Sequence, residues 1–369
     1  MQRLQRFNRT LFELSNQHLS GESEIYPIAS VLIPTYNRAE TIRYVLEGLK
    51  KQTFKDFEVL IVLKPSGDET QKVIEKSKNS LSIITIIQNQ GCMIDALNIG
   101  LENAHGKFLT FLDDDAVPLQ DWLEKIVETY ESLKVGGVAG EVMPAWILDG
   151  KPAPLQESGS EIRPDYTQFM KNWRRKLWSK PLEGLEDYFI YISKAGSVER
   201  NVDLSNYGMV KSLLGMGANM SVLTKALGDF KFPSSWILGL AYEQYMAWHL
   251  WKKGYSLVFN PKAKVHHLVH GQTLSRQIRD RRKNILRYVE KQLLFYRLYT
   301  LEKHLSIKHR ICFNTFSLLS CLKNMSVDLR NLDALSAIFL GDIIGLKYLI
   351  SRKINGNYDL LHDLKTIIG

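Results

Sequence analysis

The stretch that decides the fold is residues 107–118, KFLTFLDDDAVP, where a short apolar segment ends in three consecutive carboxylates. An apolar run of this length is typical of a buried strand, and we expect one over residues 107–112. Pro118 suits a first helical turn, so we expect a helix to open there. Asp113, Asp114 and Asp115 repel one another unless a cation lies among them, and carboxylate oxygens suit Mg²⁺ or Mn²⁺ bound to phosphates. The run alone indicates either a metal–diphosphate site or a solvated acidic turn that caps the next helix.

Strands and helices alternate on both sides of this run. The apolar patterns predict strands over residues 28–33, 57–63, 81–87, 107–112 and 137–143. They predict helices between the strands over residues 41–51, 68–77, 93–104 and 119–133. This alternation is typical of an α/β domain in which helices cover both faces of a mostly parallel sheet.

The loops that follow three of these strands are expected to line one crevice. Ligands of open parallel sheets bind beyond the carboxyl ends of the strands. The three loops cover residues 34–40, 64–69 and 113–118. The acidic run therefore lies in the predicted binding crevice.

Composition and charge narrow the class of protein. The chain has 369 residues, of which 45% are hydrophobic, so a packed core is expected. Its net charge of +9 favours anionic partners such as nucleotide phosphates, lipid headgroups or nucleic acid. The three cysteines lack metal-binding spacing, which favours a reducing compartment. Arginines interrupt residues 1–27, which predict an amphipathic segment rather than a signal peptide, and no apolar stretch of about 20 residues predicts a spanning helix.

The second half of the chain departs from the regular alternation. Residues 144–212 mix prolines, aromatic residues and charges, and we expect an insertion that covers the crevice. A helix is predicted over residues 242–253, ended by Gly254, and short strands over 255–260 and 263–267. Residues from about 275 to the end are expected to be helical.

Four sequence blocks, in order, carry a resemblance to a known family. They are SVLIPTYNR (30–38); NQG, ALNIG and AHG (89–106); the acidic run with its strand; and GANMS (217–221) followed by Tyr242-Glu243, Gly254-Tyr255 and PKAKVHH (261–267). The chain resembles family 2 glycosyltransferases, the inverting sugar-nucleotide enzymes with a GT-A fold. This resemblance implies an α/β, doubly wound, mostly parallel GT-A sheet with a C-terminal helical extension. The implied boundaries are 1–27 for an N-terminal segment, 28–270 for the catalytic domain with an acceptor-side insertion at 144–212, and 271–369 for the extension.

The resemblance also implies roles for the matching residues. Asp113 and Asp115 correspond to the outer acids of the DxD motif and, with His267, would ligate the metal. His266 is the neighbouring candidate, but the alternation of a strand lets only one of the two histidines face inward. Glu243 corresponds to the general base, although its partner position holds Tyr242. The residues expected to hold the nucleotide are Pro34, Thr35, Tyr36, Asn37, Glu40, Lys64, Asp113 and Asp114.

The identity of donor and acceptor is less closely specified. The family commonly ends its second strand in a paired-aspartate turn that helps to read the base, whereas this chain has Lys64 there, which argues against uracil recognition. A UDP-sugar is still favoured as the commonest donor of the family, and GDP and dTDP stay open. The Gln-x-x-Arg-Trp pattern of processive synthases is missing, which favours the transfer of a single sugar. The implied acceptor is a glycan or polyprenol-linked saccharide. The implied location is cytoplasmic, with peripheral contact at the cytoplasmic membrane face.

Two other classes of function fit the sequence less well. A nucleotidyltransferase would need a basic, glycine-rich loop after the first strand, and residues 34–37 do not form one. A non-catalytic nucleotide- or nucleic-acid-binding protein would fit the basic charge, but the chain has no recognisable nucleic-acid-binding motif, so no nucleic-acid partner is expected. The arginines of residues 276–287 and the apolar segment 332–350 either contact anionic lipid or form ordinary solvated and packed helices.

Overall fold

The structure is a computed structural model and describes residues 26–154, 178–201, 204, 208–233, 236–269, 281–299, 301–324, 330–354 and 364–365. Almost all of the expected N-terminal segment, residues 1–27, lies outside the described residues. So do residues 155–177, 202–203 and 205–207 of the expected insertion, and residues 270–280 at the start of the expected extension.

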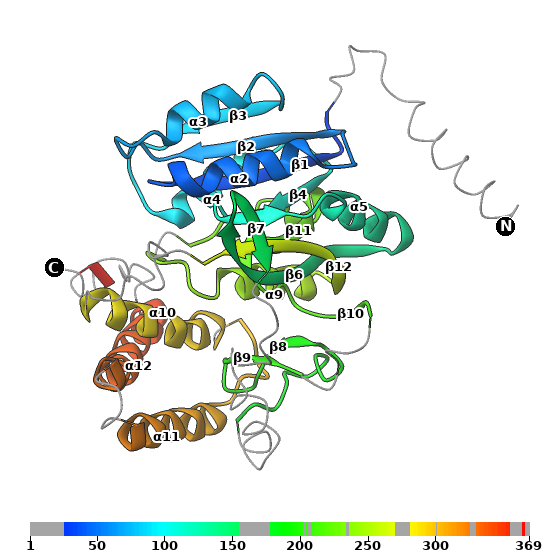
Figure 1. The fold of residues 1–369 in the computed structure, drawn as a ribbon. Helices are drawn as coiled ribbons and strands as arrows, with labels where there is room; N and C mark the ends of the chain where they lie inside the picture. The colour runs from blue at the N-terminus through cyan, green and yellow to red at the C-terminus, as the bar shows by residue number, and fades with distance from the viewer. Residues whose placement is uncertain are drawn as a thin grey trace, which may run out of the picture.

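A ten-stranded sheet runs through the molecule (Figure 1). Its order is β10-β12-β6-β11-β4-β1-β2-β3, with β5 paired to β12 and β7 paired to β6. Strands β1, β2, β3, β4, β6 and β12 point the same way, and antiparallel β11 lies between β4 and β6. The strands are β1 (Ala29–Thr35), β2 (Phe57–Leu63), β3 (Ile83–Ile87), β4 (Phe108–Phe111), β5 (Ala116–Pro118), β6 (Val135–Leu148), β7 (Lys151–Pro154), β10 (Val210–Lys211), β11 (Met220–Leu223) and β12 (Ser256–Leu268). The predicted α/β class with a mostly parallel sheet is confirmed.

Helices cover both faces of this sheet, because its central strands are apolar on both sides. One core cluster joins β1 and β2 to α2 (Ala39–Lys50), α3 (Thr70–Ser77) and α5 (Trp122–Ser132). The other joins the opposite face to α4 (Met93–Asn103), α8 (Thr224–Leu227) and α9 (Tyr242–Lys252). Gly100 lets α4 approach the sheet closely, since a Cβ there would lie 2.3 Å from a methyl carbon of Leu32.

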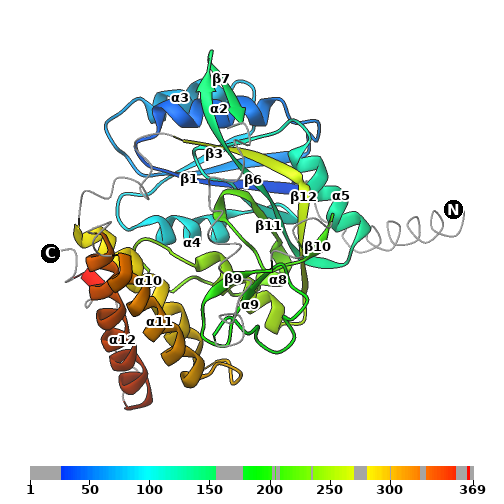
Figure 2. The ribbon, with the colours of Figure 1, turned by 60° about the horizontal axis from the view of Figure 1, so that its bottom comes forward.

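Three further helices extend the second core cluster away from the sheet (Figure 2). They are α10 (Arg281–Tyr299), α11 (Ile307–Asn324) and α12 (Arg330–Ile354). Helix α12 packs closely on α10, because a Cβ at Gly341 would touch Gln292 and one at Gly345 would meet the Tyr296 ring. Within the described residues, Asp333–Ser351 is long and apolar enough to cross a membrane by length and composition, and 33% of that stretch is buried against the rest of the chain. A small two-stranded sheet, β8 (Ile190–Ile192) with β9 (Val198–Arg200), lies beside these helices in Figure 1.

Two local predictions were wrong. Pro118 does not open a helix: it ends β5, and α5 begins at Trp122. A proline is tolerated there because β5 pairs with β12 alone, so its missing N–H breaks no second ladder. The two short strands expected over 255–267 are one strand, β12, whose register shifts between Asn260 and Lys264.

The strand predicted over residues 137–143 is longer in the structure. Residues 144–148 continue β6, and β7 pairs back on them as a hairpin. The neighbouring strand β12 runs alongside β6 as far as Ala145 and keeps it extended.

Candidate active site

The three acids lie in the turn between β4 and β5, at the carboxyl end of β4. The Ala116 N–H donates to the Asp113 carbonyl at 3.1 Å, which closes the turn and directs the chain into β5. Strand β5 then pairs with the end of β12 so that Ala116 lies opposite His267. The Leu268 N–H donates to the Asp115 carbonyl at 2.8 Å. This pairing brings a residue 152 positions later in the chain beside the acidic run.

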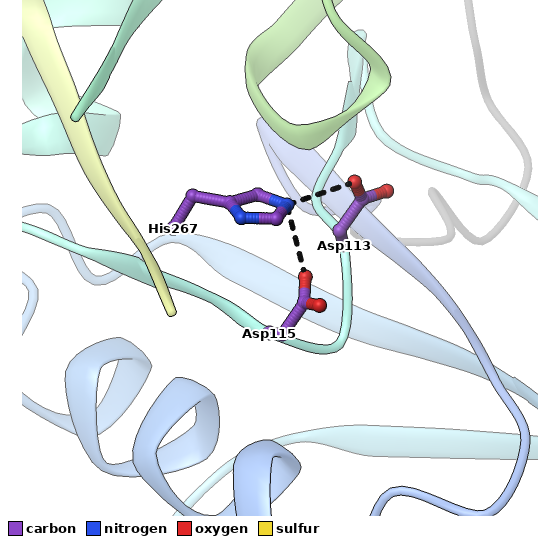
Figure 3. Close-up of side chains that lie close together, drawn as sticks. All are labelled: Asp113, Asp115 and His267. Atoms are coloured by element: carbon purple, nitrogen blue, oxygen red, sulfur yellow. Dashed lines mark ion pairs between the residues drawn. The ribbon is translucent and has the colours of Figure 1, made fainter. Parts of the chain in front are cut away.

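Two of the acids and His267 form a compact cluster (Figure 3). His267 Nε2 lies 3.2 Å from Asp115 Oδ1 and 3.9 Å from Asp113 Oδ2. One ligand atom from each residue lies within 4.8 Å of the others. His266 points to the other side of the strand, where it lines a cavity with Tyr44 and Pro118. The structure thus brings together the two expected acids and the expected histidine.

The electrostatics of the cluster suit a bound cation. Burial and the charges of Asp115 and Asp114 raise the pKa of Asp113 well above its usual range. Burial and the charge of Asp115 raise the pKa of Asp114 to about 7. Like charges this close disfavour ionisation, whereas a divalent cation among them would favour it. Two carboxylates and an imidazole nitrogen are a donor set that Mg²⁺ or Mn²⁺ accepts, so these residues fit such an ion.

Asp114 turns away from the cluster toward the loop after β1. Its Oδ1 lies 3.3 Å from Nε of Arg38, and both side chains are largely buried. The Tyr36 backbone N–H also favours the ionised form of Asp114. Asn37 adopts a left-handed backbone (φ 55°), which turns the chain between β1 and α2. The loop after β1 and the turn after β4 therefore contact each other at the carboxyl end of the sheet.

Asp68, in the loop after β2, hydrogen-bonds the start of α2. Asp68 accepts hydrogen bonds from the Ala39 N–H (3.1 Å), the Thr70 hydroxyl (2.7 Å) and the Ser66 hydroxyl (2.7 Å). These donors hold the pKa of Asp68 below its usual value although burial opposes them. Asp68 is thus occupied in fixing the loop against the start of α2.

The expected nucleotide residue Lys64 forms a separate group with Tyr36. The Lys64 Nζ donates to the Gly91 carbonyl at 2.7 Å and lies 5.7 Å from the centre of the exposed Tyr36 ring. Pro34 and Thr35 end β1, with Thr35 buried, and Glu40 is exposed in the first turn of α2. Tyr36 also lies close to the acidic run, since its backbone N–H bonds Asp114.

Glu243 lies near the cluster, in the first turn of α9. Its Oε1 accepts the Gly217 backbone N–H at 3.1 Å, and burial raises its pKa to about 7. The charge of Glu243 raises the pKa of Asp113, so the two carboxylates are within electrostatic reach. Tyr242 is buried beside Glu243, and a Cβ at Gly217 would lie 1.8 Å from its hydroxyl. Only glycine fits at position 217 without displacing Tyr242.

Asn219 fixes the wall that carries Gly217. Its amide nitrogen donates to the Glu141 carbonyl (2.8 Å) and the Ala263 carbonyl (2.9 Å), and its oxygen accepts the Trp122 indole N–H (2.8 Å). The buried Asn219 side chain thereby ties β6, β12 and α5 together. Its amide is fully used within the protein, which makes Asn219 a structural residue of this wall.

Sequence reasoning missed two contributors to the site. Arg38 lies in the SVLIPTYNR block, but its partner Asp114 is 76 residues away, and no local pattern paired the two. The backbone N–H of Gly217 carries no side-chain signal, and only the glycine itself hinted at a close approach. Both act on expected site residues, Asp114 and Glu243.

Comparison with known proteins supports one family. Residues 30–178 match the sequence model described as Glycosyl transferase family 2. The chain is 37% identical over 142 residues to Glycosyltransferase AglE of Haloferax volcanii, a match that covers 37% of this chain and 46% of that protein. It is 26% identical over 247 residues to dolichyl N-acetyl-alpha-D-glucosaminyl phosphate 3-beta-D-2,3-diacetamido-2,3-dideoxy-beta-D-glucuronosyltransferase of Methanococcus voltae, which covers 63% of this chain and 64% of that protein.

The matched stretches thus span less than two thirds of these relatives. Among solved structures, the mannosyltransferase PcManGT of Pyrobaculum calidifontis, in complex with GDP-Man and Mn²⁺, superposes with a TM-score of 0.49 at 16% identity over 99% of this chain and 92% of that one. Residues 30–178, which run from β1 through β7 and include the acids at the end of β4, are thus similar to Glycosyl transferase family 2.

Proposed function

We propose that this chain is an inverting glycosyltransferase that moves one sugar from a nucleoside-diphosphate sugar to an acceptor hydroxyl. In this proposal residues 28–270 form the catalytic domain and residues 271–369 the helical extension. The observation that carries the proposal is that a separate buried carboxylate lies close to a possible metal site. The charge of Glu243 on α9 reaches Asp113 of the Asp113–Asp115–His267 cluster.

The residues that would hold the metal are Asp113, Asp115 and His267. A Mg²⁺ or Mn²⁺ ion bound there would supply Lewis-acid stabilisation of the departing diphosphate. Asp115 is the most buried of the three acids, with 8% of its side chain exposed, and is fixed by its neighbours in β5 and β12. Asp114 is paired with Arg38 and is proposed to position the nucleotide through the loop after β1.

Glu243 is proposed as the general base. It takes the proton of the acceptor hydroxyl as that oxygen bonds to the anomeric carbon, while the bond from that carbon to the diphosphate oxygen breaks. The nucleoside diphosphate leaves on the opposite side, so the configuration of the anomeric carbon inverts. A carboxylate with a pKa of about 7 suits this role, since it is substantially ionised near neutral pH yet basic enough to accept a proton.

The nucleoside is proposed to lie along the loops after β1 and β2, which contain Pro34, Thr35, Tyr36, Asn37, Glu40 and Lys64. The exposed Tyr36 ring offers a stacking surface, and Lys64 Nζ beside it offers a cation. Asp68 is engaged by four hydrogen bonds from its own and the neighbouring loop, so it is not placed to read a base. We propose UDP as the donor nucleotide, with GDP and dTDP as the alternatives that a donor screen separates.

The acceptor is proposed to be a lipid-linked saccharide at a membrane surface on the cytoplasmic side. The Methanococcus voltae relative is by name a transferase for dolichyl N-acetyl-alpha-D-glucosaminyl phosphate, a lipid-linked sugar. Helices α11 and α12 support this proposal because they expose large apolar side chains at helical spacing. On α11 these are Ile307, Ile311, Leu319 and Leu322, and on α12 they are Phe339, Ile343, Leu346 and Ile350.

The charges of the two helices also suit an anionic lipid surface. Their sequences contain two acids, Asp333 and Asp342, and both are engaged inside the helical layer. Lys308 and Lys347 are exposed beside the apolar side chains. Apolar groups flanked by lysine bind in the plane of an anionic bilayer surface, and the packing of α12 along α10 favours this arrangement over a crossing.

A donor screen tests the catalytic proposal. Purified protein is incubated with UDP-, GDP- and dTDP-sugars, Mn²⁺ and a polyprenol-linked acceptor, and release of nucleoside diphosphate is measured with the anomeric configuration of the product. We expect one donor to turn over with inversion, and Glu243→Gln to abolish turnover while Mn²⁺-dependent nucleotide binding persists. Full turnover by Glu243→Gln, or a product with retained configuration, contradicts the proposed mechanism.

Vesicle sedimentation tests the membrane proposal. The protein should sediment with phosphatidylglycerol vesicles and much less with phosphatidylcholine vesicles, and the double variant Phe339→Asp, Ile343→Asp should stay in the supernatant. Leu148→Asp, at an exposed apolar residue on the β6–β7 hairpin, is the matched control and should bind as the native chain does. A protein that instead dimerises through α12 and ignores vesicles contradicts the membrane proposal.

A further inference from the structure

A buried carboxylate on α10 accepts hydrogen bonds from the loop that precedes α9. Glu290 is fully buried, and its two oxygens accept the backbone N–H groups of Ile237 (2.6 Å), Leu238 (2.9 Å) and Leu240 (3.3 Å). Successive backbone N–H groups that converge on one anion form an anion-binding concavity. Here the anion is a side chain of the protein's own C-terminal extension.

Arg297, two helical turns further along α10, contacts the same loop through Trp236. Its guanidinium carbon lies 4.0 Å from the centre of the Trp236 ring, and both residues are buried. The Trp236 indole N–H donates to the Leu240 carbonyl at 3.1 Å, which closes the loop on itself. The Trp236 ring also meets Tyr245 of α9 edge-on, with ring centres 5.1 Å apart.

Loop 236–241 has two residues with positive φ just before α9 begins. Gly239 has φ 73°, and Ala241, the residue before the helix, has φ 66°. A non-glycine residue in this region costs free energy and persists only where the surroundings impose it. Glu243 follows two residues later, and its carboxylate must point back to the Gly217 N–H.

Burial raises the pKa of Glu290, and the charge of Arg297 opposes that rise. Burying two opposite charges gives little net stability, because both must be removed from water. The Glu290–Arg297 arrangement is therefore better explained by the geometry that it imposes than by the stability that it adds. The loop that Glu290 and Arg297 contact leads directly to Glu243. The Asp113–Asp115–His267 cluster is formed by other elements, the turn after β4 and strands β5 and β12.

We propose that Glu290 and Arg297 are positioning residues for Glu243, which fix loop 236–241 so that the first turn of α9 presents the Glu243 carboxylate to the crevice. This inference rests on the proposed role of Glu243 as general base. It assigns the helical extension a part in the catalytic site, through α10.

The test compares kcat with nucleotide affinity in the variant Glu290→Gln, where only kcat is expected to fall. The substitution keeps the size of the side chain but places an NH₂ group against backbone donors. We expect kcat to fall by about 10- to 100-fold, as for a displacement of a catalytic group by about 1 Å. The Kd for UDP with Mn²⁺ should stay within about twofold, because the cluster that would hold the metal is untouched. The apparent pKa of kcat should also move, because the surroundings of Glu243 change.

A control on the same helix separates positioning from loss of stability. Tyr296→Phe removes a buried hydroxyl that donates to Asp342 on α12, away from loop 236–241. We expect it to lower the unfolding temperature with native kcat and a native pH profile. Arg297→Lys is a milder second variant, which keeps a buried cation but loses the planar contact with Trp236. It should lower kcat less than Glu290→Gln.

Measuring Glu243→Gln in parallel distinguishes the two levels of the inference. If Glu243→Gln turns over at the native rate, Glu243 is not the general base, and the proposed positioning role of Glu290 and Arg297 is contradicted as well. An inactive Glu243→Gln beside a Glu290→Gln with native kcat and pH profile overturns the positioning role alone. Equal losses of kcat and UDP binding in Glu290→Gln or Arg297→Lys, matching the loss of stability, also overturn it, because they show a general structural role.

Discussion

The pH dependence of turnover tests the chemistry assigned to Glu243 most directly. Its pKa is raised to about 7, chiefly by burial, against an ordinary value of 4.5. A base acts in its ionised form, so the rate should rise with pH through about 7 and level off above about 8. A single titration at about pH 7 leaves roughly 9% of Glu243 ionised at about pH 6 and roughly 91% at about pH 8. We therefore expect kcat to rise by about tenfold between these two pH values.

The assay is initial-rate release of nucleoside diphosphate at saturating donor, acceptor and Mn²⁺. Saturation with metal matters because protons compete with the ion for its carboxylate ligands, and burial and the charge of Asp115 raise the pKa of Asp113. Nucleotide binding with Mn²⁺, measured separately over the same pH range, shows where that competition begins. The residual rate of Glu243→Gln should be lower by about 10²- to 10⁴-fold and should lack the rise near pH 7.

Two results would refute this reasoning. One is a native kcat that stays constant between about pH 6 and about pH 8 while the chemical step limits the rate. The other is a Glu243→Gln variant that keeps the rise at unchanged midpoint, since the titrating group would then be a different one.

Three further predictions concern the surroundings of Glu243 and the acidic cluster. Mn²⁺ at about 100 times its Kd should stabilise the native chain against thermal unfolding by about 2.7 kcal/mol. The variant Asp115→Asn should lose most of this stabilisation. An equal stabilisation of the variant argues against a metal site at Asp115. Gly217→Ala should lower kcat because its Cβ collides with the Tyr242 hydroxyl, and adding Tyr242→Phe should restore part of the rate; no recovery in kinetic assays would count against this contact. Asn219→Leu should lower the free energy of unfolding by about 2–4 kcal/mol in denaturant titration, because three buried backbone and indole groups lose their partner; a change within error would show that these groups find other partners.

Much of the catalytic half followed from local sequence pattern. The strand over residues 57–63 was predicted to the residue, and the strand and helix over 28–51 to within a few residues, because apolar periodicity reports burial along a single element. The errors fell where a distant strand changed a local preference. Pro118 ends a strand because β12 is there to pair with it, and residues 144–148 extend β6 for the same reason.

The sequence by itself determined the alternating α/β order, the acids at the end of a buried strand and a carboxylate at the start of a later helix, since each is a property of neighbouring residues. Only the tertiary structure decided which histidine meets the acids, because a strand register shifted by one residue would have presented His266 instead. Only the tertiary structure paired Asp114 with Arg38, joined Glu243 to the Gly217 N–H and placed Glu290 of α10 under the loop before α9. These contacts join residues far apart in the chain, and their geometry depends on how whole elements pack.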